Sequence, residues 1–424
     1  MSDVAPAEAR REEEAVRVFS GPVCRFLVAR FSAAAAFQIQ GVAVGWYIYA
    51  LTNSPLDLGF VGLAMFLPAA SLALVAGHVI DRFQRRRVLL CAWMIQAAVA
   101  VTIGLLALSG RGSADLIFLL IACFGAARAF DQPAQASLLP SLVPVAIFPR
   151  VTPANSLVNQ FAVVLGPALG GLLYIFGAPI AFFGAVLMFV IGLAAISSLP
   201  PSPPRVVEPL SWTSFLSGVS FIRRAEAVLG AITLDMFGVF FGGATALLPI
   251  FARDILHIGP VGLGLLRSAP AVGALAAGLF LARHPMERHV GPRMLIAVAV
   301  FGSATVIFGL SHWLPLSVGA LILLGAADVV SVVIRSTLVQ TATPDAIRGR
   351  VSAVNSLFVG TSNQLGEFES GVTADWFGAV GSVALGGAIT LLVVAIACQR
   401  FPTLRRMDRF IMAPDAGDPA RPRG

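Results

Sequence analysis

Lysine is absent from this chain, and charged residues of any kind are few. Of the 424 residues 12% are charged and 57% are hydrophobic, and all 29 basic residues are arginine. A soluble domain has about 25% charged residues. So little charge cannot cover the surface of a chain of this length in water, and we therefore expect its solvent to be lipid. The lack of lysine also excludes a P-loop, so ATP is not expected to drive the protein directly.

Cysteine and histidine are scarce as well. The four cysteines are scattered in or beside apolar segments, and the five histidines are dispersed. They give neither a disulfide framework nor metal-ligand spacing, and no HExxH or CxxC motif occurs. We therefore expect no metal, no cofactor and no enzymatic active site.

The net charge of +7 is typical of nucleic-acid binding too, but the arginines lie in short loops, where membrane topology explains them. No nucleic-acid partner is expected.

A segment of the chain returns 200 positions later. PVAIFPRVTPANSL at 144–157 corresponds to PDAIRGRVSAVNSL at 344–357, and the same ungapped register pairs Gly125 with Gly325. A period of 200 residues is far too long for a solenoid repeat. It indicates two homologous halves of a polytopic membrane protein, which is how many transporters are built.

Apolar runs long enough to cross a bilayer as helices, which takes about 20 residues, recur along the chain. In lipid, only helices or a closed barrel give every backbone amide and carbonyl group a hydrogen-bond partner, and the lengths of the runs favour helices. We predict twelve spans, six in each half, near 26–51, 58–80, 88–109, 115–139, 153–176, 179–199, 227–252, 260–282, 293–311, 315–340, 352–374 and 379–400.

The arginines set the direction of these spans. Loops after the even-numbered spans hold most of them, whereas the loops on the opposite side hold only Arg111 and Arg253. Because arginine-rich loops stay in the cytoplasm, both termini are predicted to be cytoplasmic. The first twenty residues lack the apolar core and cleavage site of a signal peptide. We expect a multi-pass protein of the bacterial cytoplasmic (inner) membrane.

The predicted organisation has five parts. The proline-rich stretch LPPSPPRVVEP at 199–209 cannot continue a helix. The next segment, SWTSFLSGVSFIRR at 211–224, has apolar residues on one helical face. That helix either lies at the membrane interface or packs on the protein, and the sequence leaves both open. The parts are a cytoplasmic tail (1–24), a six-helix bundle (25–199), a cytoplasmic linker (200–225), a second six-helix bundle (226–401) and a cytoplasmic tail (402–424).

The loop between spans 2 and 3 carries a motif. Residues 77–87 read GHVIDRFQRRR, in which Asp-Arg comes four residues after a glycine and a basic cluster follows. This resembles the signature loop of the major facilitator superfamily, although Gln84 stands where that family usually has glycine. The resemblance implies an all-α integral membrane protein with twelve helices in two pseudo-symmetric bundles.

The same resemblance implies a latch that joins the two halves on the cytoplasmic side when the protein opens outward. Gly77 would let a neighbouring helix approach closely. Asp81 would be the latch carboxylate, and its partners would be Arg82 with Arg85 or Arg86. In the second half Ala282 stands where the acid would be, so that counterpart is expected to be weaker.

Span 5 contains LGPALGG at 165–171. This resembles the end of a motif found in the antiporter branches of the superfamily, and so favours export over uptake. Pro167 removes one backbone hydrogen bond, while Gly166, Gly170 and Gly171 permit bending and tight packing. Nearly the whole chain looks similar to the branch that holds the enterobactin exporters. That branch implies membrane export and gives weaker grounds for a siderophore substrate, since fold does not fix substrate.

Ionisable groups inside a membrane are costly and usually functional. In the superfamily, spans 1, 4, 7 and 10 line the central cavity, which implies that Gln38, Gln40, Arg128, Asp328 and Phe237 lie near the substrate. A carboxylic acid shielded from water can hold a proton near neutral pH. We therefore expect proton coupling through Asp131 or Asp235, with Glu367 as a third candidate. The alternative is that Arg128–Asp131 and Arg267–Glu367 are ion pairs that only hold helices together.

The function that fits best is secondary active export, by alternating access and proton antiport, of a small amphipathic organic compound such as a siderophore or a drug. We expect a monomer whose partners are its substrate, protons and the bilayer. A lipid or lysophospholipid flippase of the same fold remains open, because no sequence feature excludes it. A transport-dead receptor or scaffold also remains open, although the presence of Asp81 speaks against it.

Overall fold

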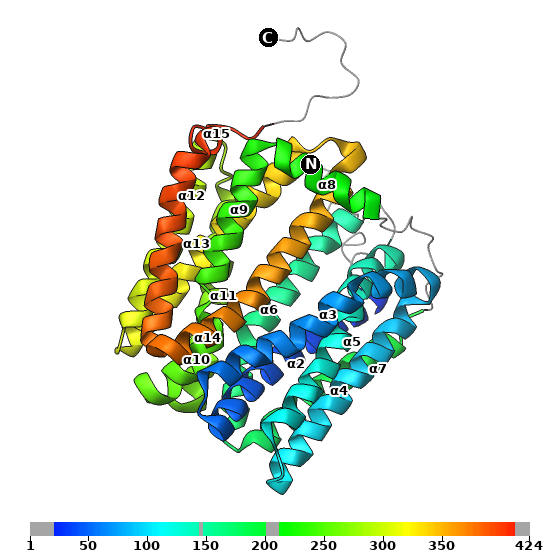
Figure 1. Cartoon of the computed structure of the whole chain (residues 1–424). Coiled ribbons are helices and arrows are strands. Elements are labelled where there is room, and N and C mark those ends of the chain that lie inside the picture. Colours follow the sequence, from blue (N-terminus) through cyan, green and yellow to red (C-terminus); the bar gives the residue numbers. More distant parts are fainter. Residues whose placement is uncertain (1–20, 144–146, 201–211, 412–424) are drawn as a thin grey trace, which may run out of the picture. The chain divides into compact units, whose positions relative to one another are not determined.

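The structure is a computed structural model that describes residues 21–143, 147–200 and 212–411. These residues form helices and no strand (Figure 1). Most of the two predicted tails and the proline-rich part of the linker lie outside the described residues.

Six long helices make up the first half of the chain, with capping residues where the sequence turns. Ser54 accepts a hydrogen bond from the Asp57 amide at the start of the second helix, and Gly110 ends the third in the left-handed conformation that glycine adopts without strain. The helices are α2 (Gly21–Thr52), α3 (Pro55–Arg82), α4 (Arg85–Ser109), α5 (Ala114–Leu142), α6 (Phe148–Tyr174) and α7 (Ala178–Ser197).

The second half begins with a short helix and then repeats this pattern with two irregularities. Its elements are α8 (Trp212–Arg224), α9 (Glu226–Phe241), η1 (Ala244–Leu247), α10 (Leu248–Ile250), η2 (Phe251–Ile255), α11 (Gly259–Arg283), α12 (Val290–Leu310), α13 (Leu314–Ala342), α14 (Asp345–Arg400) and α15 (Pro402–Arg405).

One predicted span differs from the structure in detail, and two others are joined in one element. The span predicted at 227–252 is not one helix, because α9 ends before Gly242 and a 3-10 turn and a π-helical turn follow. Gly242 and Gly243 stand at the end of α9, and glycine weakens a helix interior. The last two predicted spans both lie in α14, which breaks between them at Gly378 (φ 74°), in a conformation that favours glycine.

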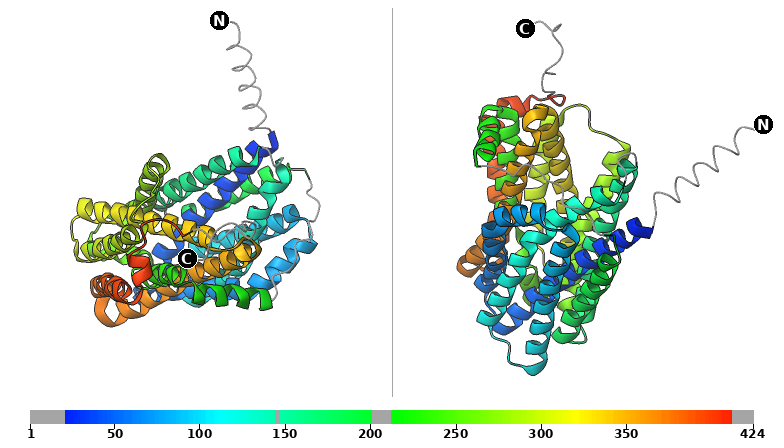
Figure 2. Two further views of the ribbon diagram at one scale, coloured as in Figure 1. Left: turned by 90° about the horizontal axis from the view of Figure 1, so that it is seen from above. Right: turned by 90° about the vertical axis from the view of Figure 1, so that its right-hand side faces the viewer.

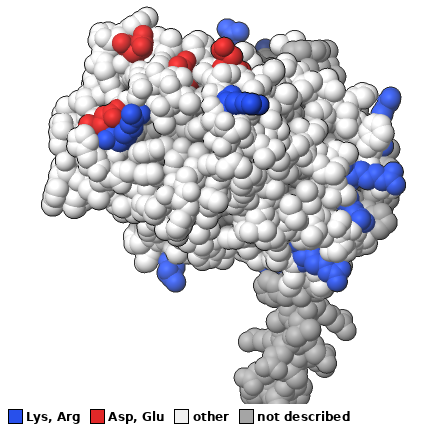
Figure 3. Space-filling model, turned by 90° about the horizontal axis from the view of Figure 1, so that it is seen from below, with Lys and Arg blue, Asp and Glu red and all other residues white. Residues whose placement is uncertain are grey.

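Ten helical segments of the described part are long and apolar enough to cross a membrane, when the interrupted run Glu226–Ile255 is counted as one of them. Counting α14 as two segments and adding α5, whose 29 residues would extend over about 43 Å at 1.5 Å per residue, gives the twelve predicted. Large apolar side chains such as Leu108, Phe176 and Phe280 are exposed, and charged side chains are few on the face shown in Figure 3. Apolar exposure on this scale is what a lipid-facing surface requires.

The chain divides into two compact units, which Figure 2 shows from two further sides. The first unit comprises residues 1–209 with 249–268, and the second comprises 210–248 with 269–424. In the first, α2 packs against α6 and α7, and α5 against α3 and α4; in the second, α14 packs against α9 and α12, and α12 also against α13. The predicted five-part organisation stays a prediction.

The 200-residue repeat is visible in each unit. Helices α5 and α13 begin at residues 114 and 314 and end at 142 and 342. A Cβ at Gly125 would lie 2.1 Å from the Met65 carbonyl oxygen of α3, and one at Gly325 would lie 1.9 Å from that of Pro270 in α11. Equivalent glycines thus let equivalent helices touch backbone to backbone, as small residues do in membrane bundles.

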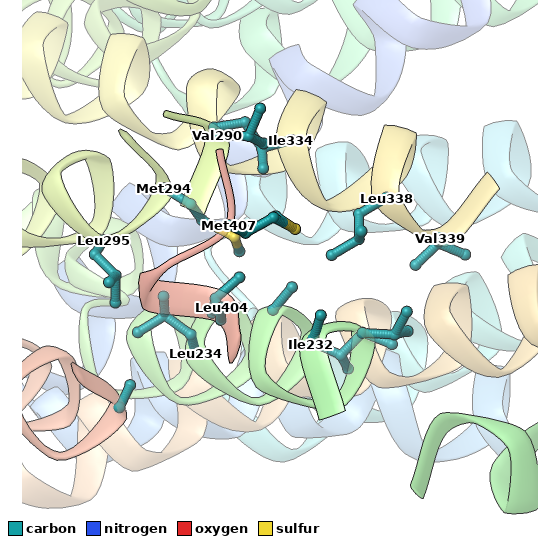
Figure 4. Close-up of a cluster of buried hydrophobic side chains, with 14 of the residues drawn as sticks. Ile232, Leu234, Val290, Met294, Leu295, Ile334, Leu338, Val339, Leu404 and Met407 are labelled. Atoms are coloured by element: carbon teal, nitrogen blue, oxygen red, sulfur yellow. The ribbon is translucent and has the colours of Figure 1, made fainter. Parts of the chain in front are cut away.

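A cluster of buried apolar side chains forms the core at one end of the second unit (Figure 4). Leu404 and Met407, after the last long helix, pack there with Val290 and Met294 of α12. Ile222 of α8 is buried in the same cluster, and a Cβ at Gly218 would lie 3.0 Å from the Arg350 carbonyl oxygen of α14. Of the two alternatives for this amphipathic helix, its described side chains fit packing on the protein.

Candidate substrate and coupling sites

The first unit contains a polar cluster centred on Asp131 of α5. Its carboxylate is 1% exposed and forms an ion pair with Arg128, at 3.0 Å between Nη1 and Oδ2. The Trp93 indole Nε1 of α4 donates to Oδ1 at 2.9 Å, and Gln96 Nε2 donates to Oδ2 at 3.5 Å. Gln135, one turn further along α5, also donates to Oδ1. Four donors therefore hold this carboxylate, which makes its burial tolerable.

Two arginines extend the cluster toward α2. The Arg128 guanidinium lies over the Phe37 ring, with Cζ 3.8 Å from the ring centroid, within the range of a cation–π contact. Arg30 donates from Nη1 to Gln135 Oε1, while its Nε is buried without a hydrogen-bond partner. No acid of the described part forms an ion pair with Arg30.

A cavity of about 190 Å³ opens beside this cluster. Its wall comes from α2, α5 and α6 and consists of Arg30, Ala34, Phe37, Gln38, Arg128, Gln132, Gln135, Asn159 and Val163. The predicted substrate residues Gln38 and Arg128 thus line one cavity. Gln40, also predicted, is buried and absent from this wall, and its Oε1 has no partner in the described part.

Arg30 was missed by the sequence reasoning. It follows an apolar stretch at the start of span 1 and reads as a residue of the cytoplasmic end. The described part of α2 already includes Gly21, before the predicted start at residue 26, so Arg30 lies at least two and a half turns inside the helix. An arginine that deep in a span is a signal that could have been used.

The second unit contains a smaller cluster centred on Asp235 of α9. Arg335 of α13 forms an ion pair with Oδ2, and Ser331 Oγ donates to Oδ1 at 3.0 Å. Asp235 and Arg335 are each 4% exposed. The partner of Asp235 lies 100 residues away in sequence, which is why local spacing could not find it.

Asp328 lies one turn before Ser331 on the same face of α13 and is half-buried. Its carboxylate has no hydrogen-bond or ion-pair partner among the described side chains. Together with Asp235 and Ser331 it lines a cavity of about 10 Å³, close to the room that one water molecule needs. Phe237, predicted near the substrate, is 40% exposed and stacks on Phe241.

Glu367 lies half-buried in α14. Arg267, its suggested partner, approaches Gly41 of α2, where a Cβ would lie 3.2 Å from Nη1. In the span 5 motif, a Cβ at Gly166 would meet Gln38 Cβ at 2.6 Å, one at Gly170 would meet Ile39 Cα at 3.0 Å, and α6 continues through Pro167. These two glycines lie at close helix contacts, and their predicted role in bending the helix stays a prediction.

Gly171 completes this motif and makes a contact of its own. A Cβ there would lie 2.5 Å from the Pro260 carbonyl oxygen at the start of α11, so this glycine too touches backbone rather than side chain.

The predicted latch loop is only partly described, because the side chain of Asp81 lies outside the described residues. A Cβ at Gly77 would meet no described atom within 4 Å, and the close helix approach expected there stays a prediction. Within its unit, α3 buries the neighbouring side chains of Ala76 and Ile80.

The arginines of the loop have separate surroundings. Arg85 donates to the Ser137 carbonyl of α5 at 3.0 Å, and Arg86 donates to the Ser197 and Leu199 carbonyls at the end of α7. Cations at helix C-termini are stabilising. Arg82 is exposed and has no partner among the described side chains.

Among the described residues, no group of three or more His, Cys, Asp or Glu side chains could hold a metal ion. The polar side chains instead form two clusters inside bundles of membrane-length helices. A family model described as a transmembrane secretion effector matches residues 19–420. The chain belongs to this family of the major facilitator superfamily. It is therefore a secondary transporter and a multi-pass membrane protein, which confirms the predicted fold class and the prediction that it is not an enzyme.

Curated relatives resemble the chain over almost its whole length. The multidrug efflux pump Tap of Mycobacterium tuberculosis is 27% identical over 418 residues, which cover 95% of this chain and 98% of the relative. The enterobactin exporter EntS of Citrobacter koseri is 27% identical over 402 residues, covering 92% and 94%.

Solved structures show the same fold at lower identity. The nucleoside transporter NupG superposes with a TM-score of 0.68 at 16% identity, covering 91% of this chain and 99% of that one. A bacterial homologue of the iron transporter ferroportin superposes with a TM-score of 0.66 at 17% identity, covering 91% and 99%. These likenesses concern the fold alone.

Proposed function

We propose that the protein exports a small amphipathic organic compound, such as a drug or siderophore, by alternating access with proton antiport. The direction of transport is supported by the relatives, which are named as an efflux pump and an exporter. The cavity beside Arg128 joins polar side chains to the Phe37 ring, which suits a compound with both polar and apolar parts. We propose that the protein is a monomer in the bacterial inner membrane and that both of its termini are cytoplasmic.

The observation that carries the coupling proposal is the half-buried carboxylate of Asp328, which has no polar partner among the described residues. An unpaired buried carboxylate is costly when charged, and protonation removes that cost. Asp235 of α9 lines the same cavity as Asp328 and pairs with Arg335 of α13. We propose Asp328 as the principal proton carrier, ahead of the predicted candidates Asp131, Asp235 and Glu367.

Asp131 is the weakest of the four as a carrier. Four donors, one of them a guanidinium, point at its carboxylate. Protonating it would break at least one of these hydrogen bonds in a buried site, because a protonated oxygen no longer accepts as before. The proposed role of Asp131 is to hold Arg128 at the cavity wall.

For the predicted latch we propose a division of labour. Arg85 and Arg86 anchor the loop to α5 and α7 through carbonyl groups, so they are less available to an acid. The exposed Arg82 is then the cation that acts with Asp81 during the transport cycle.

The test is export from cells that overproduce the protein, measured for a panel of fluorescent dyes and iron-free catecholate siderophores. We expect faster loss of at least one compound than from cells with an empty vector, and expect a protonophore to abolish the difference. Inward accumulation would refute export, and efflux that a protonophore leaves unchanged would refute proton coupling. Movement of labelled phospholipid instead of the panel compounds would favour the flippase.

A further inference from the structure

The charges around the cavity of the first unit do not balance. Arg30 and Arg128 line its wall, and the only acid in contact with either of them, among the described residues, is Asp131. Two guanidinium groups and one carboxylate leave a formal charge of +1. Asp131 is 1% exposed and is held by four donors, and it forms no ion pair with Arg30.

An uncompensated guanidinium inside a membrane-spanning bundle is expensive, and such groups usually face a cavity and meet a partner there. Arg30 has one hydrogen bond, to the neutral Gln135 amide, and its Nε is buried without any. The missing partner of Arg30 is therefore an anion that enters the cavity.

The other residues of the wall describe the rest of that ligand. Phe37 stands beside Arg128 and presents an aromatic ring, and Ala34 and Val163 add apolar surface. Gln38, Gln132 and Asn159 contribute amide groups that both donate and accept. The guanidinium fork binds a planar carboxylate through two parallel hydrogen bonds.

We propose that this cavity binds the anionic group of the transported compound, an aromatic carboxylate or an anion of similar shape, between Arg30 and Arg128 with its ring beside Phe37. The inference rests on the proposed export function and narrows its substrate class. Compounds that carry a cation in place of the carboxylate are rejected, because they would face two guanidinium groups across a cavity of about 190 Å³.

Three probes of equal size and different charge test this inference: 2-naphthoate, 2-naphthamide and 2-naphthamidine. Binding to the purified full-length protein in detergent is measured by equilibrium dialysis at constant ionic strength. We expect 2-naphthoate to bind at least tenfold more tightly than the neutral amide, and the cationic amidine not to bind. Arg30→Gln is expected to weaken 2-naphthoate binding about tenfold and to leave the amide unchanged, because one charge-assisted contact is lost.

Two further variants control for structural effects. Arg30→Lys keeps the charge but loses the fork, so its affinity for 2-naphthoate is expected to lie between those of the native protein and Arg30→Gln. Arg111→Gln, in an exposed loop, removes one positive charge elsewhere and is expected to change nothing.

Equal affinity of the native protein for 2-naphthoate and 2-naphthamide would overturn the inference, even if the Arg30 variants failed to fold. Displacement of 2-naphthoate by equimolar chloride would overturn it too, since the site would then be one for inorganic anions. Either of these two results would overturn the anion site alone, and the proposed export function would still hold if protonophore-sensitive export is observed. Export without proton coupling, together with selective 2-naphthoate binding, would contradict the proposed function and support the anion site.

Discussion

Arg128 and Asp328 occupy the same position in the two repeats of the chain and carry opposite charges. Both lie on the middle part of 29-residue helices, α5 and α13, whose ends are 200 residues apart. In the same register Asp131 corresponds to Ser331 and Gln135 to Arg335. Helices α5 and α13 therefore carry polar side chains at the same three positions, one and two turns apart, but the side chains at those positions differ in charge.

The two clusters consequently differ in net charge. The first unit joins Arg30, Arg128 and Asp131, with a formal charge of +1, whereas the second joins Asp235, Asp328 and Arg335, with a formal charge of −1. This is the physical basis for assigning different tasks to two units of common origin. An excess cation suits an anionic substrate group, and an excess carboxylate suits a proton.

The contact between α13 and α11 gives a first prediction. Gly325→Ala is expected to destabilise the protein by about 1–3 kcal/mol, because its Cβ would lie 1.9 Å from the Pro270 carbonyl oxygen and the two helices would have to separate. Gly319→Ala is the matched control in the same helix, since a Cβ there meets nothing within 4 Å. Thermal unfolding in detergent compares the two, and equal unfolding temperatures would contradict the packing described here.

The Asp235–Arg335 pair gives a second prediction. Replacing one partner, as in Arg335→Met, is expected to cost about 3–5 kcal/mol because the other charge stays buried and unpaired. The double variant Asp235→Leu with Arg335→Met is expected to recover most of that loss. Denaturant unfolding of the single and double variants measures this coupling. If the stability loss of the double variant equalled the sum of the losses of the single variants Asp235→Leu and Arg335→Met, the ion pair would not be holding α9 and α13 together.

The indole of Trp93 gives a third prediction. Trp93→Phe keeps a ring in the core but removes the donor to Asp131 Oδ1, and is expected to cost about 1–3 kcal/mol. Trp376→Phe is the control, because Trp376 is 71% exposed and its replacement should stay within about 0.5 kcal/mol. A Trp93→Phe protein as stable as the control would mean that Asp131 does not depend on this donor.

The loop between α3 and α4 gives a fourth prediction, which separates anchoring from latching. Arg86→Gln is expected to lower stability by about 1–3 kcal/mol, since it removes charge-assisted hydrogen bonds to the end of α7. Arg82→Gln should leave stability within about 0.5 kcal/mol but slow transport. Unfolding temperature and initial transport rate are measured on both variants, and unchanged transport in Arg82→Gln would argue against its proposed role.

Much of the fold could be predicted from the sequence, because lipid imposes long apolar helices and the repeat fixes their number. The break at Gly378 lies between the two spans that the sequence predicts there. The irregular turns before and within η2 interrupt a continuously apolar run, so hydropathy alone could not locate them.

The site was predicted less completely, for a reason of distance. Arg128 and Asp131 are three residues apart, and their ion pair could be expected from helical spacing. The partner of Asp235 is 100 residues away on another helix, and Arg30 meets Gln135 across 105 residues. Such pairings depend on how helices pack, which spacing along one helix does not contain.

The central claim is that a proton taken up by Asp328 drives export. Its most direct test is substrate-induced proton flux across proteoliposomes with an imposed pH gradient, using a compound that the export screen identifies. Native protein and Asp115→Asn, which alters an exposed acid in the first turn of α5, are expected to move protons with substrate. Asp328→Asn is expected to insert normally and to move none, whereas native rates in Asp328→Asn would contradict the claim.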